Sequence, residues 1–324
     1  MLKKMSMRKL MVATLTLFIL MILYMMPDSI IDKSLDIKND NVEYVYSNSL
    51  DVIYLLDSND YVARTKINVT KTDDISSKTK ELTEGLIIDG SKSNIIPNGF
   101  RSIIPSGTSI LNLSLEDKIL TIDFSKELLD INIEYEEKMI EAIVYTLTSI
   151  DGIDKVIIKV EGKKLTKLPK SGKLLPDILD KSYGINKVYD ISSMHSIDSF
   201  TLYYVNSYND SNYYVPVTKY INNDNQDKIK VIIEELSSAP IYESNLMSFL
   251  DVSTKLLDYE LKEDTIKLNF NNAILSDVTS NNILEEVIYT ISLAMDDNYG
   301  VEEVVFLVEN EEICYSSVKE LKNK

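Results

Sequence analysis

Residues 111–124 read LNLSLEDKILTIDF, with apolar and polar residues alternating on both sides of a short charged turn. Alternation with a period of two is typical of a β-hairpin that has one apolar face. Residues 257–270 read LDYELKEDTIKLNF and repeat this pattern 146 residues later. An internal repeat at this spacing indicates two copies of one module. The residues expected in the two cores are Leu120, Ile122, Phe124, Ile266, Leu268 and Phe270.

An amphipathic helix is predicted after each hairpin, because apolar residues recur with the spacing i, i+3, i+4 and i+7. These positions are Ile140, Ile143, Val144 and Leu147 in the first copy and Leu284, Val287, Ile288 and Ile291 in the second. A short loop and an apolar run follow in both copies, at residues 156–160, where Lys159 interrupts it, and at 304–308. Such a run predicts a central strand of a sheet.

The segments upstream of the hairpins also agree between the copies. Strands are expected at residues 52–56 and 62–69, and again at 200–205 and 213–217. A helix follows each pair, and Asp74 and Asp227 precede these helices as expected N-caps. The sequence therefore predicts an α/β (α+β) protein of two tandem ββαββαβ modules. Since each helix has one apolar face, the helices are expected on one face of a mixed sheet.

This pattern divides the chain into segments. Residues 51–169 form the first domain and residues 200–313 a second, divergent one. Each copy contains a complete set of elements, so a fragment of residues 45–170 is expected to fold alone. The polar residues 28–50 are expected to be a tether, 170–199 a linker and 314–324 a tail.

The N-terminal segment, residues 1–27, carries a cationic flank followed by the apolar run Leu10 to Met26. Its 17 residues are at the short end of what spans a hydrocarbon core of about 30 Å. Neither an Ala-x-Ala cleavage site nor a lipoprotein cysteine follows, which favours an uncleaved signal anchor. Because cationic flanks stay in the cytoplasm, we expect a single-pass protein of the cell membrane with extracytoplasmic C-terminal domains.

The charge excludes nucleic acid as a partner. The chain holds 34 basic and 51 acidic residues, and all four cations before residue 27 lie in the flank, which leaves the rest still more acidic. Such a surface repels phosphate backbones. Cys314 is the only cysteine, so neither an intrachain disulfide nor a thiolate metal cluster can form. This thiol is either incidental or forms an intermolecular bridge.

No catalytic, cofactor-binding or metal-binding residue is predicted. His195 is the only histidine and lies in the linker, away from any expected nucleophile. Asp123 and Ser125 share one face of a strand but have no acidic or hydroxyl counterpart at Asn269 and Asn271, so a structural role is expected. Neighbouring carboxylates are expected on solvated faces; these are Glu136/Glu137, Glu285/Glu286 and Asp296/Asp297.

Tyrosines concentrate at the opening hairpin of the second copy. One interpretation is an interaction surface, because aromatic side chains favour protein contacts. The alternative is a half-buried hairpin of strand-favouring residues. The candidates for this surface are Tyr203, Tyr208, Tyr213 and Tyr214.

Three phrases, IPSGT at residues 104–108, LTIDFSKELL at 120–129 and GIDKVIIKVEG at 152–162, resemble the signature of the GerM domain family. The resemblance covers residues 51–169 well and 200–313 more weakly, where NFNN replaces DFSK. It implies a ring-building-motif-like fold and an extracytoplasmic protein of endospore-forming bacteria without known catalysis. Many relatives carry a lipoprotein cysteine, which this chain lacks, so its mode of anchoring departs from theirs.

The leading hypothesis is a non-enzymatic assembly or scaffold protein of sporulation or spore germination, which binds envelope or sporulation proteins or itself. The alternative is an accessory protein that binds or remodels peptidoglycan. An envelope hydrolase has little support, since no pair of carboxylates has the spacing of a glycosidase. No cofactor is expected.

Overall fold

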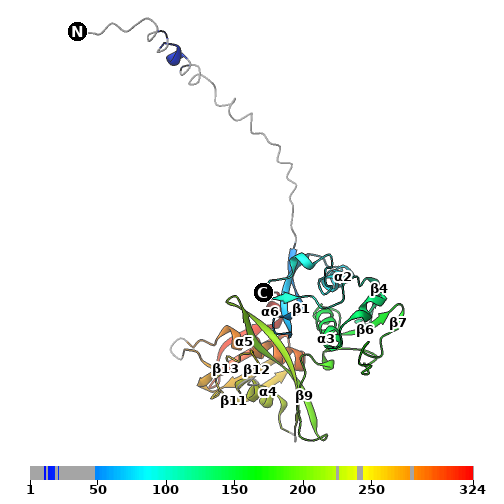
Figure 1. The fold of residues 1–324 in the computed structure, drawn as a ribbon. Helices are drawn as coiled ribbons and strands as arrows, with labels where there is room; N and C mark the ends of the chain where they lie inside the picture. The colour runs from blue at the N-terminus through cyan, green and yellow to red at the C-terminus, as the bar shows by residue number, and fades with distance from the viewer. Residues whose placement is uncertain are drawn as a thin grey trace, which may run out of the picture. The chain divides into compact units, whose positions relative to one another are not determined.

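The computed structural model describes Met11, Thr14–Phe18, Met21 and residues 48–323 except 224–225, 239–243 and 278–280. The chain divides into Met1–Tyr46 and a compact unit, Ser47–Lys324 (Figure 1). Most of the predicted anchor, residues 1–27, and of the tether, 28–50, lies outside the described residues. Among the described residues, no helix has the length and hydropathy needed to cross a membrane.

The first repeat follows the predicted order of elements. Its strands and helices are β1 (Asn48–Asp57), β2 (Val62–Thr70), α2 (Ile75–Gly85), β3 (Phe100–Arg101), β4 (Ile110–Glu116), β5 (Ile119–Phe124), α3 (Glu136–Leu147), β6 (Lys155–Val160) and β7 (Lys163–Lys164).

The second repeat follows the same order after the short strand β8 (Val188–Asp190). Its elements are β9 (Ile197–Tyr208), β10 (Ser211–Asn222), α4 (Lys228–Ser237), β11 (Leu256–Lys262), β12 (Thr265–Phe270), α5 (Glu285–Tyr299), β13 (Glu303–Val308), β14 (Glu311–Ser317) and α6 (Val318–Asn323). The predicted mixed α+β class is confirmed.

The strands form three sheets and not one mixed sheet for each module, which corrects the sequence-based expectation. Each repeat has its own four-stranded sheet, in the orders β4-β5-β6-β7 and β11-β12-β13-β14. In both, an antiparallel hairpin is extended by a parallel strand, β6 or β13. The opening strands of the two repeats instead merge into one six-stranded sheet, β3-β1-β2-β10-β8, with β9 paired to β10.

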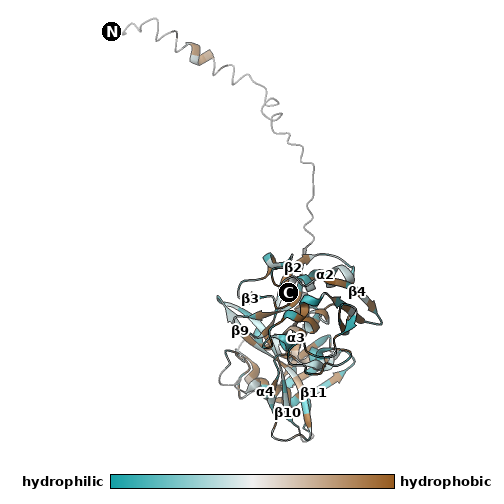
Figure 2. Cartoon of the chain, turned by 45° about the vertical axis from the view of Figure 1, so that its right-hand side comes forward, coloured by the Kyte–Doolittle hydropathy of each residue, from teal (hydrophilic) through white to brown (hydrophobic). Residues whose placement is uncertain are grey.

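The central helices explain why the strands separate into layers. Helix α3 contacts β1 and β2 on one side and β6 on the other, and α5 contacts β9 as well as β13 and β14. Ten of the twelve residues of α3 are buried, so this helix needs cover on both sides and not on one apolar face only. Figure 2 maps the hydropathy of these elements onto the ribbon.

Most local expectations of the sequence are met within both repeats, but Leu284, expected on the apolar face of the second helix, precedes α5 and is exposed. All six residues expected in the cores are buried, and the rings of Phe270 and Phe306 stack with centroids 6.3 Å apart. Both predicted N-caps are confirmed: the Asp74 carboxylate accepts from the backbone N–H groups of Ser76 and Ser77, and Asp227 caps α4 in the same way.

The predicted linker and tail are built into the unit. Leu175, Leu179 and Ile185 of the linker are buried, and residues 314–323 form the second half of β14 and helix α6. Helix α6 returns to the first repeat and contacts β1. The repeats share a sheet and these segments, so a fragment of residues 45–170 would lack the strand β10 that lies beside β2. That this fragment folds alone stays a prediction.

Candidate interaction surfaces and the junction between the repeats

The tyrosines of the hairpin β9–β10 are mostly interior residues. Tyr203 and Tyr213 are 1% and 8% exposed, whereas Tyr208 is 36% exposed. Tyr214 is half-buried, and its ring stacks on Tyr289 with centroids 5.3 Å apart. The proposed tyrosine surface therefore does not exist as a set, because the hairpin lies against the first repeat and turns Tyr203 and Tyr213 inward. Of the four candidates, Tyr208 is the most exposed.

Asp57, at the end of β1, accepts a hydrogen bond from one of these tyrosines. Its carboxylate is 1% exposed and accepts from the Tyr213 hydroxyl at 2.8 Å and the Asn206 side-chain amide at 3.2 Å. It also accepts from the backbone N–H groups of Asn59 and Tyr61, at 2.8 and 2.9 Å. A buried carboxylate is tolerated only when donors surround it. Asp57 thus joins the first turn of repeat 1 to the hairpin of repeat 2.

A second buried group lies between α5, β9 and the linker. The side chain of Asp297 is 2% exposed; it pairs with Lys181 and accepts from the Tyr203 hydroxyl at 2.5 Å. Burial alone would lower the pKa of Lys181, but the carboxylates of Asp297 and Asp296 outweigh it and hold that pKa above its ordinary value. The Tyr145 hydroxyl of α3 donates to the Lys181 carbonyl at 3.1 Å. The linker is therefore held from both repeats.

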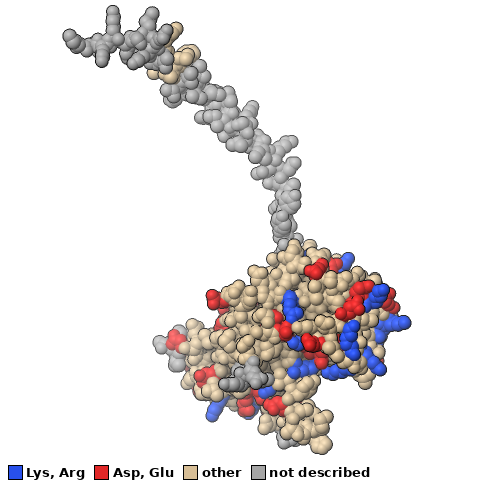
Figure 3. All heavy atoms as spheres, in the orientation of Figure 1, with Lys and Arg blue, Asp and Glu red and all other residues tan. Residues whose placement is uncertain are grey.

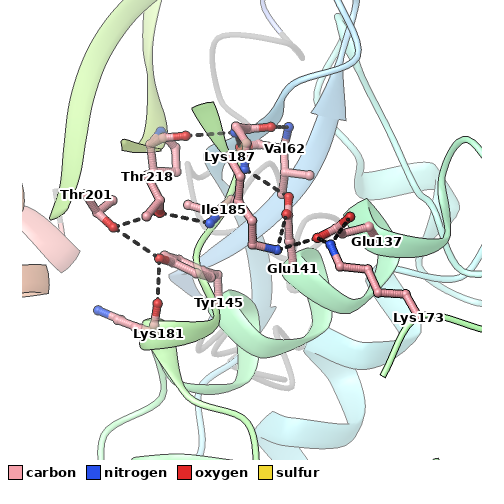
Figure 4. A network of polar contacts seen from close by, with 12 residues as sticks. Val62, Glu137, Glu141, Tyr145, Lys173, Lys181, Ile185, Lys187, Thr201 and Thr218 are labelled. Atoms are coloured by element: carbon pink, nitrogen blue, oxygen red, sulfur yellow. Dashed lines mark hydrogen bonds and ion pairs between the residues drawn. The ribbon is translucent and has the colours of Figure 1, made fainter. Parts of the chain in front are cut away.

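The third group fastens the linker to α3 (Figure 4). Lys187 lies with its Nζ 2.7 Å from Glu137 Oε1 and 3.0 Å from Glu141 Oε1, and Lys173 Nζ lies 2.8 Å from Glu137. Burial raises the pKa of Glu141, although Lys187 opposes it. Beside this network lies a hollow of about 370 Å³, lined in part by Tyr61 and Tyr189. Two of the lysines that line this hollow, Lys173 and Lys187, are already paired with these glutamates.

Two carboxylate pairs expected on solvated faces are thus partly interior, which corrects that expectation. Glu136 is 2% exposed and accepts from the backbone N–H groups of Lys170 and Ser171, at 2.7 and 3.0 Å. The side chain of Asp297 is 2% exposed. The reason is that the linker, which looks like a spacer in the sequence, packs over the helix that carries Glu136 and beside the helix that carries Asp297.

Asn186 connects the shared sheet directly. Its side-chain amide donates to the carbonyls of Val62 in β2 and Pro216 in β10, both at 2.8 Å. Its Oδ1 accepts from the backbone N–H of Val62 at 3.0 Å. Strands β2 and β10 pair directly at one register position, Tyr214 with Arg64. The side chain of Asn186 adds a second link between these strands, because it hydrogen-bonds to the backbone of both.

Helix α6 is held at its C-terminal end by two cations of β2. The side chains of Arg64 and Lys66 donate to the carbonyl of Leu321 at 3.1 and 3.3 Å. Cations are stabilising where helix carbonyls lack partners. Burial and the neighbouring Arg64 lower the pKa of Lys66 to about 8.

We expect this lysine to make stability depend on pH. The unfolded chain binds the Lys66 proton more tightly than the folded one, so between about pH 8 and the ordinary lysine pKa of 10.5 the contribution of Lys66 to the free energy of unfolding should rise with pH. The buried tyrosines, whose pKa values burial raises, act in the opposite direction near pH 10 in both proteins, so the contribution of Lys66 is the difference between wild type and variant. Lys66→Met should remove that rise. Urea unfolding of both proteins across this window measures it; superimposable pH profiles would contradict the assignment.

Asp123 and Ser125 have structural contacts that the second repeat reproduces with asparagines. The Asp123 carboxylate accepts from the backbone N–H of Gly162 at 3.0 Å, and Asn269 accepts from that of Asn310 at 2.9 Å. Ser125 Oγ accepts from the backbone N–H of Ser109, and Asn271 Oδ1 accepts from that of Lys255, both at 2.9 Å. What the two copies share is therefore a hydrogen-bond acceptor and not an acid.

This equivalence predicts that Asp123→Asn is nearly silent. Asparagine keeps the acceptor, so the free energy of unfolding should change by less than about 0.5 kcal/mol. Asp123→Ala removes the acceptor and should cost about 1 kcal/mol. Urea denaturation followed by circular dichroism compares the two. Equal losses for both substitutions would mean that the charge, and not the acceptor, matters at this position.

The remaining candidates bring no reactive groups together. His195 is exposed, and its hydrogen bonds run through its backbone to Ser193 and Asn222. Cys314 is half-buried in β14, where burial raises the pKa of its thiol. In the described part of the chain, no group of three or more His, Cys, Asp or Glu side chains is placed to hold a metal ion.

The two four-stranded sheets expose the same edge. Strands β4 and β11 are edge strands, and each has a register irregularity at the same place, beside Leu111 or Leu257. Both leucines are exposed, as are Leu115 and Leu261 four residues further on. Unpaired edges with apolar side chains are common sites of contact with other chains.

The fold and its junction define a tandem-repeat α+β protein whose two modules share a sheet. Residues 52–166 and 201–314 both match the sequence pattern of Germane, a family described as "Sporulation and spore germination". The chain belongs to this family.

Two relatives agree with this assignment. The spore germination protein GerM of Bacillus subtilis (strain 168) is 33% identical over 259 residues, which cover 78% of this chain and 69% of that protein. The solved structure of the tandem GerMN domains of the sporulation protein GerM from Bacillus subtilis matches with a TM-score of 0.75 at 31% identity. That match covers 82% of this chain and 92% of the other.

Proposed function

We propose that this protein is a non-enzymatic assembly or scaffold protein of sporulation or spore germination, which acts through protein–protein contacts in the spore envelope. One observation carries the proposal: the polar pair Asp123 and Ser125 is replaced by asparagines that make the same structural contacts in repeat 2. The other distinctive polar groups, around Asp57, Asp297 and Glu141, hold the repeats together. Because these polar groups have structural roles, the exposed surfaces of the two modules are the candidates for function.

In this proposal the N-terminal segment, residues 1–27, anchors the chain in the cell membrane, with the repeats outside. The cationic flank and apolar run support it. Protease added to intact protoplasts should then digest the repeats, and their protection would reverse the topology. The modules act as ring-building-motif-like units whose partners are envelope or sporulation proteins.

The functional test is complementation of sporulating cells with full-length variants. His195→Ala, Asp123→Asn and Ser125→Ala should each support sporulation as the wild type does, with protein level and melting temperature as the checks on folding. An Asp123→Asn chain that folds but fails would argue for an enzyme. Retention of the full chain on purified cell-wall sacculi would favour the peptidoglycan-binding alternative instead.

A further inference from the structure

The last strand of repeat 1 and the start of the linker form a segment of like charge. The chain has a formal net charge of −17, yet residues 155–173 contain seven lysines and one acidic residue. Five of these lysines fall within residues 163–173, which contain no acidic residue. We call residues 163–175 the lysine arm. The charge of this arm is opposite to that of the chain as a whole.

The arm has a buried side and an exposed side. Leu168 and Leu175 are 3% and 7% exposed and belong to the core of repeat 1, whereas all five lysines are exposed. Leu174 is 73% exposed and pairs with Lys167 through a β-bridge. Residues that pair in this way lie beside each other on one face. The exposed side of the arm therefore combines cations with an apolar side chain.

The shape of the arm is fixed by hydrogen bonds. The buried Glu136 carboxylate of α3 accepts from the backbone N–H groups of Lys170 and Ser171, at 2.7 and 3.0 Å. The N–H of Gly172 donates to the carbonyl of Leu168 at 3.1 Å, which closes the turn. A buried carboxylate is tolerated only where donors meet it. The arm is thus an ordered element that holds its lysines in place.

Most of this charge is not neutralised within the chain. Three lysines of the arm form no ion pair with any described residue: Lys163, Lys167 and Lys170. Lys164 reaches only the exposed Asp177, at 3.6 Å. In Figure 3, lysine and arginine side chains gather on the side where Figure 1 places β6 and β7. The arm therefore presents positive charge to the solvent at this end of repeat 1.

We propose that the lysine arm binds the surface of an anionic lipid bilayer. Its lysines lie beside the headgroups, and Leu174 enters the boundary between headgroups and acyl chains. The proposal rests on the membrane anchoring proposed above, because a chain anchored through residues 1–27 always has a bilayer within reach. It adds a second membrane contact, which holds repeat 1 against the lipid surface.

The chemistry of the arm favours lipid over an acidic protein. Arginine binds carboxylates in a bidentate manner and is common where acidic peptides are recognised, but the arm contains no arginine. Lysines are compact point charges, and a row of them suits many mobile headgroups. Repulsion from the acidic repeat 2 is limited, because charges more than about 8 Å from the bilayer are largely screened at physiological ionic strength.

Capture of vesicles by the anchored protein tests the proposal. The full-length chain is inserted through its N-terminal segment into nanodiscs of phosphatidylcholine, which carry no net charge. These are mixed with vesicles of phosphatidylcholine alone, or of equal parts of phosphatidylcholine and phosphatidylglycerol, and flotation measures capture. We expect capture by the anionic vesicles only, and its loss when salt is raised from about 0.05 to 0.5 M.

Two variants with the same change in net charge separate the arm from the whole chain. The arm variant carries Lys163→Gln, Lys167→Gln and Lys170→Gln, and it should bind anionic vesicles at least about tenfold more weakly. The control variant changes three exposed lysines of repeat 2 that form no ion pair with described residues, and it should bind as the wild type does. Its substitutions are Lys230→Gln, Lys255→Gln and Lys267→Gln.

A second matched pair tests the apolar contact without changing any charge. Leu174→Gln should weaken capture about threefold or more, because a polar side chain is not stabilised at the acyl boundary. Val252→Gln changes a side chain of repeat 2 that is 80% exposed and should have no effect. Circular dichroism checks folding, and this pair decides the question if the arm variant fails to fold.

A wild type that anionic vesicles do not capture, or that uncharged vesicles capture equally well, overturns the proposal. Equal losses in the arm and control variants also overturn it, because net charge would then explain the binding. Binding of polyglutamate through the arm, without vesicle capture, overturns it and assigns the arm to an acidic protein. A chain that does not insert into nanodiscs contradicts the proposed anchoring instead; the same variants are then compared with the chain in solution, which still decides the role of the arm.

Discussion

Phe270→Ala is expected to lower the free energy of unfolding by about 3–5 kcal/mol. Phe270 is fully buried in β12, and its ring stacks against Phe306 of the neighbouring strand. Removing the ring leaves a cavity between the sheet and α5 that the surrounding strands cannot close. Urea denaturation of the full chain, followed by circular dichroism, measures the loss. Phe124→Ala, at the equivalent position of repeat 1, should cost a similar amount.

Leu257→Ala is the matched control, because Leu257 lies on the adjacent strand β11 but is exposed. It should change the free energy of unfolding by less than about 0.5 kcal/mol. The shared sheet couples the two repeats, which gives a second measurement. Phe270→Ala, although it lies in repeat 2, should lower the urea midpoint of a single transition in which both repeats unfold together. A loss below about 1 kcal/mol for Phe270→Ala would contradict the packing described here.

The second large effect is expected at Asp57, which joins the repeats through Tyr213 and Asn206. Asp57→Ala removes the acceptor of four hydrogen bonds and leaves the buried Tyr213 hydroxyl and Asn206 amide without it. An unsatisfied buried donor costs about 1–3 kcal/mol, so we expect a loss of about 3 kcal/mol or more. Thermal and urea unfolding of the full chain measure it.

Tyr213→Phe provides the comparison, because it removes one donor and leaves the carboxylate with three. Its cost should be about 1.5–3 kcal/mol, the range for a hydrogen bond to a charged group. Asp57→Asn keeps an acceptor and should fall between the two. If Asp57→Ala costs no more than Tyr213→Phe, then Asp57 does not organise this junction.

Local patterns were enough to predict the elements of both repeats. The hairpins alternate with a period of two, the helices recur with a period near 3.6, and Asp74 and Asp227 cap helices where expected. These signals depend on neighbours within a few residues, so they can be read from one sequence. The structural contacts of Asp123 and Ser125 also agree with the role expected for them, because the comparison with Asn269 and Asn271 was available in the sequence.

The tyrosines show where sequence patterns stop being sufficient. Tyr203, Tyr208 and Tyr213 lie on one hairpin and look alike in the sequence, yet one is exposed and two are buried. Their environment depends on Asp57 and Asp297, which are distant in the chain. The periodicity of the hairpin sequence does not indicate which distant residues will contact it. The structural role of the linker could not be predicted for the same reason. Asn186 and Lys187 bind β2 and α3, which are brought beside them only by the tertiary fold.

The sequence by itself determined that this protein has two copies of one module, which elements each copy contains and which family it resembles. Tertiary structure decided that the opening strands of both copies form one sheet, that the linker and helix α6 fasten the copies together, and which polar groups are buried. The physical reason is that secondary structure follows from short-range periodicity. Burial and pairing across more than a hundred residues depend instead on how complete layers pack.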